Sequence, residues 1–91
     1  MKKLTEQEIQ NKMKEIPNWR YEDDAIVRNW SFNDFSEAMD FINQIARLAE
    51  DHDHHPELYN VYNKVSLKFS THDAGGLTNR DFKIAQDIDK L

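Results

Sequence analysis

The chain has 91 residues, with 12 basic and 17 acidic side chains, two Trp, three Tyr, five Phe and no cysteine. Domains usually have about 100–150 residues, so residues 1–91 are expected to form a single domain with a small core. The aromatic residues argue against a disordered chain. The net charge of −5 argues against direct binding of nucleic acid. The lack of cysteine excludes disulfides, thiolate metal sites and a cysteine nucleophile.

The N-terminal segment starts with Lys2 and Lys3 and becomes polar before an apolar signal region could form. No segment approaches the roughly 18–20 apolar residues that a membrane-spanning helix needs. We therefore expect a cytoplasmic protein without a membrane partner.

The first helix is predicted from its capping residues. Thr5 is a suitable N-cap with Glu8 three residues later, and Leu4 and Ile9 can form a hydrophobic staple around it. Pro17 ends this helix after about eleven residues, a length that is only marginally stable without packing.

A hairpin is expected next, with strands Trp19–Glu22 and Ala25–Phe32 joined by the turn residues Asp23 and Asp24. Alternation in the second strand places four side chains on one face: Ile26, Arg28, Trp30 and Phe32. Asn33 or Asp34 then caps a long helix that runs to about Glu50. Its wide apolar stripe indicates packing on a core and not a cofactor pocket.

A second hairpin is predicted from strands Glu57–Tyr62 and Val65–Thr71, joined by Asn63 and Lys64. This loop would pair Tyr62 with Val65; one long strand is the alternative.

Gly75 and Gly76 form a bend, and Thr78 with Asp81 resembles a second capping box before the last helix. The order α-β-β-α-β-β-α predicts an α+β fold, in which helices cover one face of a four-stranded antiparallel sheet.

The four histidines all lie between His52 and His72. The predicted hairpin would return His72 to the end of the sheet from which His54 and His55 depart, so three imidazoles could share one cleft. Imidazole has a pKa near 6.5, and such a group can both donate and accept protons at neutral pH.

Three interpretations of this cluster are open. Surface histidines at a helix C-terminus interact favourably with the helix dipole and with nearby carboxylates. A metal site is the second, although the spacing His-x-His-His matches no common zinc motif. The third is general acid–base catalysis without a metal, which suits histidines close to several carboxylates.

The run AEDHDHHPELYNVYNKVSLKFSTHDAGGLTNRD resembles the signature of the pterin-4a-carbinolamine dehydratase family. The signature comprises a histidine pair before proline, then N-V-Y-N-K-V, then S-T-H-D with two glycines, L-T and an aspartate. The resemblance covers nearly the whole chain. Leu58 departs from it, because many members have an aromatic residue there.

The resemblance implies a hydro-lyase reaction, in which 4a-hydroxytetrahydropterin loses water and becomes quinonoid dihydropterin during tetrahydrobiopterin recycling. It also implies that the reaction needs neither a metal nor a redox cofactor. The family's essential histidines correspond to His54, His55 and His72. Asp81 matches a carboxylate at or near the cleft, as a catalytic group, a helix cap or both.

The resemblance further implies that the pterin contacts the three histidines and a set of flanking residues: Glu50, Asp53, Ser70, Thr71 and Asp73. His52 falls outside the signature and is expected to be a solvated bystander. Members form homodimers or homotetramers through the sheet and the helices. The alternative function is a non-catalytic protein-binding module, since some animal members serve as dimerisation cofactors.

Overall fold

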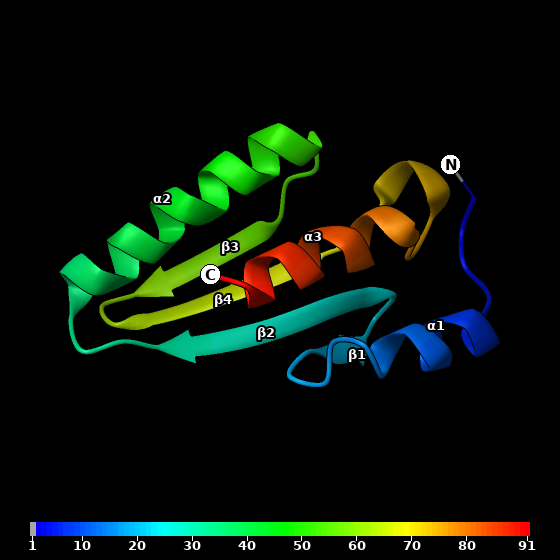
Figure 1. Ribbon diagram of the computed structural model, residues 1–91, viewed down its shortest axis with the longest axis horizontal. Coiled ribbons are helices and arrows are strands. Elements are labelled where there is room, and N and C mark those ends of the chain that lie inside the picture. The colour runs from blue at the N-terminus through cyan, green and yellow to red at the C-terminus, as the bar shows by residue number, and fades with distance from the viewer. Residues whose placement is uncertain (1) are drawn as a thin grey trace.

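The computed structural model describes residues 2–91. Figure 1 shows three longer helices and a four-stranded sheet. The elements follow in the expected order: α1 (Glu6–Met13), β1 (Arg20–Glu22), β2 (Ala25–Ser31), α2 (Phe35–His52), β3 (Glu57–Val61), β4 (Lys64–Phe69), the 3-10 helix η1 (His72–Ala74) and α3 (Asn79–Asp89). The α+β fold class and the antiparallel four-stranded sheet are confirmed.

Both predicted capping boxes are present. Thr5 and Glu8 exchange hydrogen bonds at the start of α1, and Thr78 and Asp81 do so at the start of α3. The bonds from Thr5 hold the pKa of the Glu8 carboxyl below its ordinary value. Helix α1 ends at Met13 and is shorter than expected, because the chain forms turns before it reaches Pro17.

The sheet has the strand order β1-β2-β4-β3, so β2 and β4 are the inner strands and β1 and β3 lie at the edges. The first hairpin turns at Asp23 and Asp24 as predicted, and both residues have positive φ angles, of 52° and 59°. Successive positive φ angles are typical of the two-residue turn whose twist matches that of the flanking strands.

The second hairpin is present, but its predicted register is wrong. Val65 pairs with Asn60 and not with Tyr62, and the loop consists of Tyr62 and Asn63. The side chain of Asn60 donates to the carbonyls of Tyr62 and Lys64, and that of Asn63 donates to the carbonyl of Phe32. These side-chain hydrogen bonds stabilise strands that are shorter than the predicted ones. Tyr62 has a φ of 50° and lies exposed in the turn.

The core lies between one face of the sheet and the helices. Ile26 of β2 and Val65, Leu67 and Phe69 of β4 are buried, and they pack with apolar residues of all three helices. The apolar stripe of α2 lies in this core as expected, through Ala38, Phe41, Ile45 and Ala49. The alternation of β2 places Arg28 on the same face, where it pairs with Asp89 of α3 at 2.6 Å and stacks on Trp30.

No helix within residues 2–91 is both long enough and apolar enough to cross a bilayer.

We expect Leu67→Ala to destabilise the fold, because Leu67 is completely buried at the centre of the sheet. Removing such a side chain costs the lost apolar burial plus the cavity, about 2–5 kcal/mol in the free energy of unfolding. Urea denaturation measures this loss. Ser66→Ala, which alters the opposite face of the same strand, is the control and should change stability by less than about 1 kcal/mol. Equal losses in the two variants would contradict the assignment of the core face.

Candidate active site

The C-terminal end of α2 fixes the position of His54. Asp53 has a left-handed conformation that ends the helix, and the amide of His54 donates to the carbonyl of Ala49 at 2.9 Å. Arg80 at the start of α3 donates through Nη2 to the carbonyls of His52 and Asp53. The last carbonyls of a helix lack partners within the helix. Arg80 therefore supplies a donor and joins the end of α2 to the start of α3.

His54 and Asp81 form a buried pair. Nε2 of His54 lies 2.5 Å from Oδ1 of Asp81, and Asp81 is completely buried while His54 is 8% exposed. The other carboxylate oxygen, Oδ2, accepts hydrogen bonds from the hydroxyl of Thr71 at 2.9 Å and from the amide of Thr78 at 3.0 Å. A buried charge is tolerated where hydrogen bonds satisfy it, so these donors allow a carboxylate at this position.

His55 points to a different partner. Its Nε2 lies 2.5 Å from Oε2 of Glu50, and the side chains of both residues are largely exposed. Together they line one end of an apolar hollow of about 350 Å³ between α2 and β3. Solvent screens an exposed pair of this kind, so it orients the imidazole more than it stabilises the fold.

His72 lies on the exposed helix η1 and lines a cavity of about 280 Å³. Lys68 and Glu57, which are opposite each other on neighbouring strands, line the same cavity with Ser70. The hydroxyl of Ser70 donates to the carbonyl of Asp24, and this bond holds the first hairpin turn against the cavity wall. The cavity can therefore present an imidazole, an ammonium group and carboxylates to one small ligand.

The structure separates the expected site residues into three neighbouring groups. It brings together His54, Thr71 and Asp81, and separately His55 and Glu50, while His72 and Ser70 line a cavity of their own. Of the five cavities described for residues 2–91, one is lined by His72 and another by His55, and none of the five is lined by His54. Asp53 and Asp73 are exposed beside these groups.

His52 is not the solvated side chain that the sequence suggested. It is half-buried, and its Nε2 lies 2.8 Å from Oδ2 of Asp87 in α3. The pair forms because α3 packs along the C-terminal part of α2, which brings Asp87 over His52.

Several residues near these groups were not expected from the sequence as parts of a site. Thr78 was expected only as a helix cap, and Glu57, Lys68 and Arg80 were not considered. The capping box does indicate that Asp81 turns back toward Thr78. The contact of both residues with Thr71 depends on the tertiary fold.

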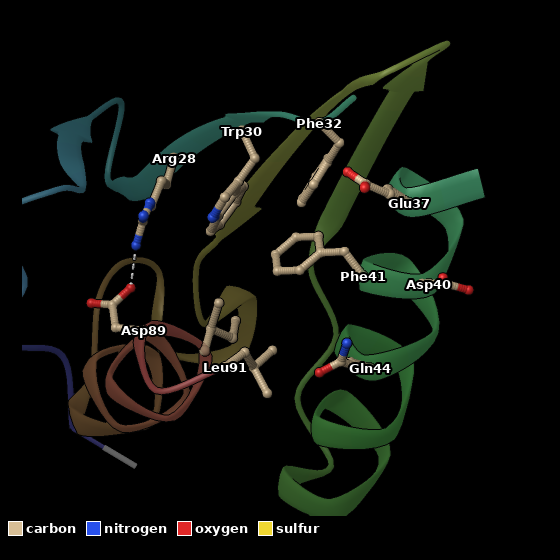
Figure 2. A pocket seen from close by; sticks show the side chains of 10 residues that line it. Arg28, Trp30, Phe32, Glu37, Asp40, Phe41, Gln44, Asp89 and Leu91 are labelled. Atoms are coloured by element: carbon tan, nitrogen blue, oxygen red, sulfur yellow. Dashed lines mark hydrogen bonds and ion pairs between the residues drawn. The ribbon is translucent and has the colours of Figure 1, made fainter. Parts of the chain in front are cut away.

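A separate cleft of about 370 Å³ contains no histidine (Figure 2). It lies between α2 and the C-terminal end of α3, and the rings of Trp30, Phe32 and Phe41 point toward one another along it. Carboxylates of Glu37, Asp40 and Asp89 line the cleft.

In the described part of the chain, no three histidine, aspartate or glutamate side chains lie close enough to hold a metal ion together.

Comparisons with known proteins place the chain in a family. The sequence profile described as "Pterin 4 alpha carbinolamine dehydratase" matches residues 2–91. A protein of Picosynechococcus sp., provisionally named a pterin-4-alpha-carbinolamine dehydratase, is 45% identical over 89 residues, which is 98% of this chain and 97% of that protein. A protein of Thermomicrobium roseum with the same provisional name is 43% identical over 91 residues, 100% of this chain and 98% of its own length.

A solved structure supports the same assignment. The crystal structure of a "transcriptional coactivator/pterin dehydratase" from Brucella melitensis matches with a TM-score of 0.91 and 39% sequence identity. The match covers 97% of this chain and 96% of that one. The expected family is therefore confirmed, and the chain belongs to the pterin-4-alpha-carbinolamine dehydratase family.

Proposed function

We propose that this protein is a hydro-lyase that removes water from 4a-hydroxytetrahydropterin and thereby returns the pterin to its redox cycle. The observation that carries the proposal is the buried His54–Asp81 pair in a chain of this family. The pair holds one largely buried imidazole in place, and Thr71, which also binds Asp81, directly precedes the exposed His72 in the chain.

The reaction requires two proton transfers. The bond between carbon 4a and the hydroxyl oxygen breaks, and the oxygen takes up a proton and leaves as water. A ring nitrogen loses a proton, and its electron pair completes the new double bond. One protonated and one neutral imidazole can perform these steps, and each such transfer contributes about 10²–10⁴-fold to the rate.

The environments of the histidines favour distinct roles. A carboxylate beside an imidazole stabilises the imidazolium that forms during proton transfer, and Asp81 occupies this position next to His54. We therefore propose that His54 donates a proton to the leaving hydroxyl and that His72 removes the proton from the ring nitrogen. His55, oriented by Glu50, binds the pterin beside them.

The cavity at His72 supports a small planar substrate. Its volume of about 280 Å³ lies just below the range that is usual for small-molecule sites, roughly 300–1,000 Å³. The 2-amino-4-oxo edge of a pterin presents N–H donors beside a carbonyl acceptor. Glu57 can accept from those donors, and Lys68 can donate to that carbonyl.

Replacing the two imidazoles tests the proposal. We expect His54→Ala and His72→Ala each to lower kcat by about 10²–10⁴-fold, because each removes one proton-transfer group. The measurement follows quinonoid dihydropterin by ultraviolet absorbance after freshly generated 4a-hydroxytetrahydropterin is mixed with the protein. His52→Ala is the matched control and should retain its kcat, because the imidazole of His52 pairs with Asp87 and takes no part in the proposed proton transfers. No acceleration by the unaltered protein, or full activity in both variants, would refute the proposed function.

The protein is also proposed to form a homodimer or homotetramer. Strand β3 is an edge strand, so one side of its backbone has no partner strand within residues 2–91. Three side chains of this strand are large, apolar and exposed: Leu58, Tyr59 and Val61. The apolar hollow between α2 and β3 continues this surface. An unpaired apolar edge is a suitable surface for another copy of the chain.

Light scattering after size-exclusion chromatography tests this assembly. We expect a mass of two or four chains for the unaltered protein and a single chain for Leu58→Lys, which places a charge in the hollow. Lys83→Ala, an exposed change on α3, serves as the control and should leave the mass unchanged. A monomer of the unaltered protein at about 100 µM, well above typical dimer dissociation constants, would contradict the assembly.

A second candidate function is protein binding without catalysis. The name of the Brucella melitensis protein includes "transcriptional coactivator", and the cleft of Figure 2, lined by aromatic rings and carboxylates, is a surface that could bind a partner. The enzyme assay distinguishes the two functions, because a pure binding module would not accelerate the dehydration and would not depend on His54 or His72.

A further inference from the structure

The hydrogens around Asp81 can be assigned one by one. An ionised carboxylate only accepts hydrogen bonds, so Nε2 of His54, the hydroxyl of Thr71 and the amide of Thr78 all donate to it. The single hydroxyl hydrogen of Thr71 is thereby committed. Oγ1 of Thr78 lies 2.8 Å from Oγ1 of Thr71, so the hydroxyl of Thr78 is the donor in this contact.

The start of α3 completes this chain of hydroxyls. Oγ1 of Thr78 accepts from the amide of Arg80 at 3.3 Å, so its own hydrogen remains free for Thr71. Thr78 is completely buried and Thr71 is 6% exposed, so water does not compete for these bonds. The hydrogen bonds run in one direction, from Arg80 through Thr78 and Thr71 to Asp81.

The donor assignment determines which nitrogen of His54 is available. With its hydrogen on Nε2 facing Asp81, a neutral His54 has its lone pair on Nδ1. Nδ1 makes no hydrogen bond to the described residues, and no buried side-chain nitrogen or oxygen among them lacks a partner. Nδ1 therefore lies on the small exposed edge of the ring, while Phe69 packs close to the ring with a centroid distance of 5.6 Å.

We propose that Thr78 and Thr71 form a hydroxyl relay that positions Asp81, and through it His54, so that Nδ1 of His54 is the nitrogen that exchanges a proton with the substrate. This inference rests on the proposed dehydratase function. Thr71 and Thr78 are positioning residues in this account, because their hydroxyls are fully used inside the protein.

The relay explains why the carboxylate keeps one orientation. Thr71 and the Thr78 amide both bind Oδ2, which leaves Oδ1 for His54. Without the hydroxyl of Thr71, the carboxylate has one donor fewer and can rotate away from the imidazole. A misplacement of about 1 Å in a reacting group can cost about 10²-fold in rate.

The first test compares isosteric and conservative variants. Thr71→Val removes the hydroxyl and keeps the shape, while Thr71→Ser keeps the hydroxyl. We expect Thr71→Val to lower kcat by about 10–100-fold with KM changed by less than about twofold, and Thr71→Ser to recover most of the loss. Thr78→Val and Thr78→Ser should show the same contrast.

Thr5 provides a matched control for the loss of stability that follows when a threonine N-cap is removed. Thr5 begins α1 with the same capping box as Thr78 but lies at the exposed start of the chain. Thr5→Val should lower the free energy of unfolding, because a capping bond is lost, and should leave kcat unchanged. Full kcat in both Thr71→Val and Thr78→Val, with the fold retained, would overturn the relay.

The second test does not depend on activity. Nitrogen-15 NMR of the imidazoles reports which ring nitrogen carries the hydrogen. We expect neutral His54 of the unaltered protein to carry it on Nε2, and Thr71→Val to show a mixture of the two forms. A hydrogen on Nδ1 of neutral His54 in the unaltered protein would overturn the relay. Absence of dehydratase activity in the unaltered protein, with the hydrogen of neutral His54 still on Nε2, would instead refute only the proposed function.

Discussion

The buried carboxylate of Asp81 is the interaction on which the rest of the site depends. It joins three segments through His54, Thr71 and Thr78: the second residue after α2, the second residue after β4 and the N-cap of α3. Removing one partner from a buried charged group costs several kcal/mol, because the remaining charge is left without its bonds. The same contacts that satisfy the charge therefore hold the two helices and the central strand in one arrangement around His54.

The site combines one fixed imidazole with two exposed ones. His54 is held by a completely buried carboxylate, while His55 pairs with an exposed Glu50 and His72 lies on the short helix η1 without an ion-pair partner in residues 2–91. Titratable groups in contrasting environments can take opposite roles in acid–base catalysis. A dehydration needs such a division, because one proton must be delivered while another is removed.

Local signals in the sequence predicted most of the fold, while contacts between distant segments could not be predicted. The capping boxes at Thr5 and Thr78 and the turn at Asp23 depend on neighbouring residues, so they were recognisable. The register of β3 with β4 depends on the amide of Asn63 reaching Phe32, which lies 31 positions away. The sequence likewise pointed to His54 and Asp81, but their pairing with Thr71 follows only from the packed fold.

The most direct test of the central claim is a crystal structure with a bound tetrahydropterin analogue. The account predicts that the pterin ring occupies the surface at the cavity of His72, with Nδ1 of His54 and the imidazole of His72 each within hydrogen-bonding distance of the ring system. Nε2 of His54 should remain on Asp81 in that complex. An analogue bound in the aromatic cleft of Figure 2, or bound without contact to either imidazole, would contradict the account.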